Sequence, residues 1–171
     1  MVIVYYQMIK TGGQNMLNNH QHLEYDIKLE NVRNQIANSK EGKVNIKGKI
    51  YSTVGLRLFK LREVFGTRVT IKTEVLENSD DKVFVKAEIY LNYDCGQLML
   101  SDGYAEKKRN LNIITKNSAV EFCQTTALGR SLAFLGLSGS NEIASAEEIF
   151  ASEEQIAEKE VQPTVKSKGG L

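Results

Sequence analysis

The side chains best suited to chemistry in this sequence are cations, and they gather in three places. The segment from Lys40 to Lys72 contains nine lysines and arginines but only two glutamates. The run Lys107-Lys108-Arg109 forms a second group, and Arg130 stands alone in a stretch, 122–140, that holds no other charged residue. Clustered cations attract a polyanion without reading its sequence. The pattern therefore favours a polyanion-binding surface, although charge alone also allows a solvated basic face without a ligand.

Acidic side chains gather near the end of the chain. The segment from Asn141 to Glu160 contains seven glutamates and only one lysine, although the whole chain has a net charge of only +1. The apolar residues among them form a thin helical stripe, and the following residues have the composition of a disordered tail. We expect residues 141–171 to be an acidic, partly helical to disordered tail that does not touch a polyanion, because like charges repel.

The sequence does not support an enzyme. The segment from Gly42 to Ile50 differs from a phosphate-binding loop, because five residues separate its glycines and Ile50 stands where Ser or Thr would hold a metal. The triplet Glu106-Lys107-Lys108 offers a Glu-x-Lys without carboxylates that clearly converge on it. Cys95 and Cys123 have no metal-site spacing. We therefore expect a binding protein that needs no cofactor and no metal.

Period-two alternation of apolar residues predicts two strands, over residues 68–76 and 83–91, and the length and neighbours of residues 97–106 suggest a third. The connections between them, 78–81 and 93–96, are of hairpin length, and such connections impose antiparallel order. The simplest arrangement is a three-stranded antiparallel meander.

Three helices complete the expected core. Residues 23–38 have an amphipathic period, and residues 51–65 have Ser52 or Thr53 as a cap and Gly66 as a stop. The third helix, 117–137, starts with an S-x-x-E capping box at Ser118 and is rich in small residues, which suits close packing. Residues 39–48 read as a basic loop. The predicted fold is α+β: the meander packed on the helix that follows it, with helices preceding it.

The chain is expected to hold one folded domain, residues 23–140, after an extension over residues 1–22. Gln124, Thr125 and Arg130 make the 117–137 helix a poor membrane span. With no recognisable signal peptide and no paired cysteines, we expect a cytoplasmic protein of a bacterium or of a phage-infected host cell.

The order of these elements resembles the single-strand annealing superfamily, which includes the eukaryotic Rad-fifty-two annealing protein and phage recombinases of the Erf and Sak kinds. Two segments carry the likeness: YSTVGLRLFKLREVFG, residues 51–66, before the first strand, and TTALGRSLAFLG, residues 125–136, after the third. The resemblance covers about half of the chain, from Lys47 to Leu137.

The resemblance implies ATP-independent annealing of complementary strands in homologous recombination. It further implies a homo-oligomer, as a ring or a filament, that holds single-stranded DNA by its backbone in a basic groove. Arg130 matches the family's helix cation, whereas Gly129 and Ala133 stand where the family often has further basic residues. On this likeness the acidic tail becomes a candidate for recruiting an exonuclease or a single-strand binding protein. The residues expected to contact DNA are all basic: Lys43, Lys47, Lys49, Arg57, Lys107, Lys108, Arg109 and Arg130.

Two alternatives stay open at this point. One is a passive single-stranded DNA-binding module of the five-stranded barrel type, which would protect single strands and inhibit their pairing. The other is a structural assembly protein whose small-residue helix serves only subunit packing. Arg130 has two possible partners as well, a phosphate or a buried carboxylate.

Overall fold

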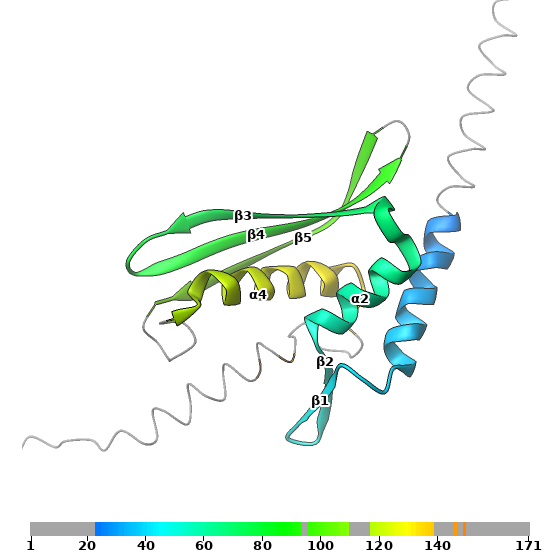
Figure 1. Ribbon diagram of the computed structural model, residues 1–171, viewed down its shortest axis with the longest axis horizontal. Helices are drawn as coiled ribbons and strands as arrows, with labels where there is room; N and C mark the ends of the chain where they lie inside the picture. Colours follow the sequence, from blue (N-terminus) through cyan, green and yellow to red (C-terminus); the bar gives the residue numbers. More distant parts are fainter. Residues whose placement is uncertain (1–22, 94–95, 110–116, 139–145, 147–148, 150–171) are drawn as a thin grey trace, which may run out of the picture.

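The computed structural model describes residues 23–93, 96–109, 117–138, 146 and 149. A helix over residues 23–38 comes first. The elements that follow are β1 (Lys43–Ile46), β2 (Lys49–Ser52), α2 (Val54–Phe65), η1 (Gly66–Arg68), β3 (Val69–Asn78), β4 (Lys82–Tyr93), β5 (Gly96–Lys108) and α4 (Ala119–Phe134). Figure 1 shows α4 along one face of the β3-β4-β5 sheet, with α2 and the first helix gathered at one end of that sheet.

The sheet is the predicted antiparallel meander, with β4 between β3 and β5. Alternate residues of β4, from Val83 to Leu91, are buried on the face that α4 covers, as the period-two pattern predicts. The register runs from Val69 opposite Leu91 to Asn78 opposite Val83, with one irregularity after Val75. The α+β fold class and all three strands are thus confirmed.

Helix α4 approaches β5 unusually closely at Gly103. A Cβ at residue 103 would lie 2.5 Å from the backbone nitrogen of Ser131 and closer still to the carbonyl oxygen of Ala127. On either side of this contact, the hydroxyls of Ser101 and Ser131 are 3.0 Å apart, and the Cys123 thiol donates to the Ala105 carbonyl at 3.1 Å. The small residues of α4 therefore serve close packing on the sheet, as the sequence predicted.

The core has two parts with different side chains. Under the first half of α4 the buried residues are small, with Val83, Val85, Ala105 and Cys123 among them. Where α2 and the helix 23–38 meet the sheet, the core is built instead from large aliphatic and aromatic side chains: Leu29, Val32, Ile36, Leu61, Phe65, Ile89, Leu132 and Leu137. Burial of these larger side chains supplies most of the hydrophobic stabilisation, since it scales with apolar area.

The helix ends agree only in part with expectation. Thr53 caps α2, because its hydroxyl accepts a hydrogen bond from the backbone nitrogen of Leu56 at 3.1 Å. At α4 the predicted capping box is wrong: Ser118 makes no side-chain cap bond, and its backbone (φ −139°, ψ 43°) is not in the extended conformation typical of a cap. Gly136, with φ +83°, ends this helix in the left-handed region.

The basic segment expected to be a loop contains a hairpin. β1 and β2 pair in register, and Lys47 and Gly48 at the turn both have positive φ, as a tight two-residue turn requires. The side chain of Asn45 supports the turn by accepting from the Gly48 nitrogen at 2.9 Å. The sequence did not predict this hairpin, because its strands have only four residues each and are too short to show a clear alternation of apolar and polar residues.

The hairpin packs against two described residues of the predicted tail. Ile46 and Tyr51 are buried against Ala146, which is 1% exposed, with Ile149 packed beside them. At least this part of the predicted tail therefore belongs to the packed body, because the hairpin offers an apolar surface to it. The extension over residues 1–22, Cys95 and most of residues 141–171 lie outside the described residues. None of the described helices is long and apolar enough to cross a membrane.

The close approach at Gly103 generates a stability prediction. Gly103→Ala should lower the free energy of unfolding by about 1–3 kcal/mol, because backbone atoms of α4 occupy the space that the new methyl group needs. Thermal unfolding followed by circular dichroism would measure the change. Gly55→Ala in α2 is the matched control: its nearest neighbour would be 3.9 Å away, so it should be neutral or stabilise by about 0.5–1 kcal/mol. Equal melting temperatures for wild type and Gly103→Ala would contradict this account of the helix position.

Candidate nucleic-acid interface

Three of the predicted DNA contacts lie on the β1-β2 hairpin. Lys47 is exposed at its turn, Lys49 is exposed on β2, and half-buried Lys43 donates to the Ala37 carbonyl at 2.6 Å. Figure 1 shows the hairpin projecting from the side of the sheet that α4 covers. The structure therefore presents these lysines on the α4 side of the molecule.

Lys107 and Arg130 lie on the same side, next to α4. On β5, Lys107 follows the buried Ala105 by two residues and so points to the α4 face, where its ammonium lies 4.9 Å from the centre of the Phe122 ring. The Arg130 guanidinium donates to the Tyr104 carbonyl at 3.0 Å and remains partly exposed. Its position joins α4 to β5, while part of its surface still faces solvent.

The two residues after Lys107 do not lie beside α4. Lys108 is exposed on the opposite face of the sheet, across from Lys82 in register. The Arg109 guanidinium donates to the Ser79 carbonyl at 2.8 Å and to the Asn78 side chain, while its backbone nitrogen donates to Asp81. Arg109 thus ties the end of β5 to the β3-β4 turn, so the basic run does not form one cluster.

Among the residues predicted to contact DNA, Arg57 differs most clearly from expectation. Its side chain is 0% exposed, inside the core between α2 and α4, and it donates to the Gly129 carbonyl at 3.4 Å. In this conformation Arg57 has no surface to offer to DNA, and the predicted contact is wrong for this residue. A signal was present in the sequence, because Arg57 is four residues before the fully buried Leu61 on the same helix face.

The other face of the sheet carries aromatic rings among charges, and no described element covers it (Figure 1). Phe84 and Tyr104 stack with ring centres 6.0 Å apart, and the Lys72 ammonium lies 4.5 Å from the centre of the Tyr90 ring. The cross-strand register places five carboxylates and four lysines here: Glu74, Glu77, Glu88, Asp102 and Glu106 with Lys72, Lys82, Lys86 and Lys108. The balance of charge makes this face a poor surface for phosphates.

Ion pairs on this open face shift the pKa values of the lysine and glutamate side chains that form them. A hydrogen bond from the Lys86 ammonium is the main reason that the pKa of Glu88 is lowered, and the same bond raises the pKa of Lys86. Lys82 likewise has a raised pKa, first because of its hydrogen bond to Glu106 and then because of Glu77. These lysines are charged at neutral pH, but each already has a carboxylate partner.

The described ranges contain no group of three His, Cys, Asp or Glu side chains that could hold a metal ion. Cys123 is buried, and its thiol faces the carbonyl groups of Val83 and Ala105. Burial is the main cause that raises its pKa, which disfavours the nucleophilic thiolate.

Comparisons of the chain with models of protein families, with curated proteins and with solved structures find no match. Geometry and charge are the properties that distinguish one face of the protein from the other. By those criteria the best surface is the α4 side of the sheet, with the hairpin lysines, Lys107 and Arg130.

The setting of Cys123 predicts its reactivity. In a Cys95→Ser background, Cys123 should react with iodoacetamide at pH 8 much more slowly in the folded protein than in denaturant, because burial both shields the sulfur and raises the pKa of its thiol. Mass spectrometry of timed samples would measure the modification. Equal rates in the folded and unfolded protein would show that α4 does not protect this position.

Proposed function

We propose that this chain binds single-stranded DNA and anneals complementary strands without ATP, as a homo-oligomer acting in homologous recombination. One observation carries the proposal. Cations from three segments that are far apart in the sequence, the β1-β2 hairpin, Lys107 of β5 and Arg130 of α4, lie on the same side of the sheet. Cations arranged in this way suit an extended polyanion, because each phosphate contact adds to affinity without depending on base sequence.

Annealing needs bases that remain free to pair. Binding on the α4 side would hold the phosphates by lysine and arginine side chains, which contact the backbone and not the base edges. The aromatic rings that could stack on bases lie mainly on the opposite face, where carboxylates balance the lysines. This separation favours backbone binding over a passive protein that would hold the bases themselves.

The outer edges of the sheet support the proposal that the chain forms an oligomer. Within the described residues, β3 and β5 each pair only with β4, so the outer edges of a 10-residue and a 13-residue strand have no partner strand. Apolar side chains are exposed near both edges, with Val75 and Leu76 on β3 and Leu98 and Met99 on β5. Such edges readily pair with another chain. A second copy would cover them.

The barrel alternative has less support. The described strands form one two-stranded and one three-stranded sheet, not a closed five-stranded barrel. The proposed activity places the protein in the cytoplasm of a bacterium or of a phage-infected cell, where DNA recombination takes place. An acidic C-terminal segment would there be available to an exonuclease or a single-strand binding protein.

The neighbouring lysines at the end of β5 give a matched pair of variants. Lys107→Gln should weaken binding to a fluorescent oligothymidylate several-fold and make the slope of log K against log salt shallower by about 0.7, the value for one lost single-strand phosphate contact. Lys108→Gln removes the same charge from the opposite face and should leave both quantities unchanged. Fluorescence anisotropy over a series of salt concentrations would measure them. If both variants weaken binding equally, the interface is not on the α4 side.

A second experiment tests annealing itself. Without nucleotide, the wild type should accelerate the pairing of two dye-labelled complementary strands, and Arg130→Gln should reduce this rate while leaving the fold intact. Arg33→Gln is the control, because Arg33 is also partly exposed and donates to a backbone carbonyl, that of Gly136 at 3.3 Å, but is not one of the cations proposed to bind DNA. Stopped-flow energy transfer would measure the rates, and circular dichroism the folding.

The three functional alternatives give different results in this experiment. Slower pairing than in buffer would identify a passive single-strand binder. Absence of DNA binding even at low salt would favour a structural assembly protein. Unfolding of Arg130→Gln would show that its bond to Tyr104 is mainly structural.

A further inference from the structure

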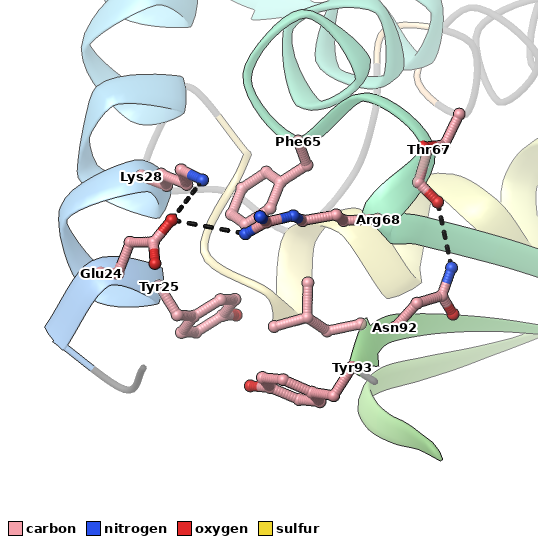
Figure 2. Close-up of a pocket in the computed structure, with 9 residues that line it drawn as sticks. Glu24, Tyr25, Lys28, Phe65, Thr67, Arg68, Asn92 and Tyr93 are labelled. Atoms are coloured by element: carbon pink, nitrogen blue, oxygen red, sulfur yellow. Dashed lines mark hydrogen bonds and ion pairs between the residues drawn. The ribbon is translucent and has the colours of Figure 1, made fainter. Parts of the chain in front are cut away.

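A cavity lies between the helix 23–38, η1 and the end of β4, away from the cations discussed above. Its volume is about 360 Å³, within the range of roughly 300–1,000 Å³ common for small-molecule sites. Figure 2 shows side chains from all three elements turned toward it. The cavity is at the Tyr93 end of β4, whereas Lys107 is beside the opposite end of that strand, at Val83.

Aromatic rings form much of the cavity wall. Tyr25 and Phe65 pack with ring centres 5.8 Å apart at an angle of 50°, and Tyr93 lies across from them on β4. In Figure 2 the hydroxyl ends of Tyr25 and Tyr93 are turned toward each other. Burial, and then the charge of Asp26, raises the pKa of Tyr25 to about 12, so its phenol stays neutral and able to donate near neutral pH. Flat rings with polar ends suit a ligand that is both aromatic and polar.

Two cations and one carboxylate stand at the same cavity. Glu24 accepts from Lys28 at 2.6 Å and from Arg68 at 3.4 Å. The Arg68 side chain is 62% exposed and extends from η1 across the cavity toward Glu24 (Figure 2). A long, exposed ion pair of this kind contributes little, so the guanidinium can exchange the carboxylate for a phosphate at small cost.

We infer that this cavity takes one nucleotide of the bound strand, with its base against Tyr25 and Tyr93 and its phosphate on Arg68. The inference rests on the proposed function, because it assigns a subsite to the same ligand. An aromatic wall beside an exchangeable arginine matches a nucleotide, which joins a flat base to an anion, better than it matches an ion or an apolar ligand alone. One inserted base would hold the strand in place, while the remaining bases stay free to pair.

The test uses the full chain and the fluorescent nucleotide 2-aminopurine deoxyriboside monophosphate, alone and within an oligothymidylate. The base should be quenched on binding, and the free nucleotide should bind more tightly than either the nucleoside or inorganic phosphate. Arg68→Gln should weaken binding of the nucleotide about tenfold, as expected for the loss of one charge-assisted hydrogen bond. Arg33→Gln removes another arginine that pairs with a glutamate, Glu30 at 3.2 Å, and should change nothing.

The outcomes separate this inference from the proposed function. If the wild type binds and anneals DNA but does not quench 2-aminopurine, or if Arg68→Gln binds the nucleotide like the wild type, the subsite is overturned and the function stands. Inorganic phosphate that competes as well as the nucleotide would also overturn it, because the rings would then contribute nothing. If the wild type binds no DNA, both proposals fail.

Discussion

The contact of α4 with β5 at Gly103 is the constraint on which much of this structure depends. Because the helix backbone lies where a side chain at residue 103 would be, the neighbouring positions on both elements have to be small. The same closeness brings the Arg130 guanidinium to the Tyr104 carbonyl and the Phe122 ring to Lys107. The packing of the core and the placement of two proposed ligand contacts thus have one geometric origin.

Strand alternation then decides which charges can act together. Lys107 and Lys108 are neighbours in the sequence, yet they point to opposite faces of the sheet, and only one of those faces has unbalanced positive charge nearby. A count of charges along the chain cannot make this distinction. The open face shows why it matters, since its lysines are matched by carboxylates across the strands and its rings are interleaved with them.

The sequence predicted what depends on long periodic patterns. Ten or more residues of alternating burial define β4. The predicted bounds of the small-residue helix, 117–137, differ from those of α4 by at most three residues at either end. It did not predict features that depend on a few residues or on distant ones. The hairpin rests on the backbone of Lys47 and Gly48, Arg57 was counted as surface charge although its helix face is buried, and the Tyr25 cavity joins segments that only the fold brings together.

The burial of Ala146 against Ile46 and Tyr51 has a consequence for the order in which the molecule assembles. A hairpin of two four-residue strands is marginal by itself, and here part of its apolar cover is supplied by residues about a hundred positions later in the chain. Closing so long a loop is slow compared with local pairing. During synthesis the meander and α4 can therefore form first, while the lysine-bearing hairpin acquires its final packing only when the C-terminal segment has left the ribosome.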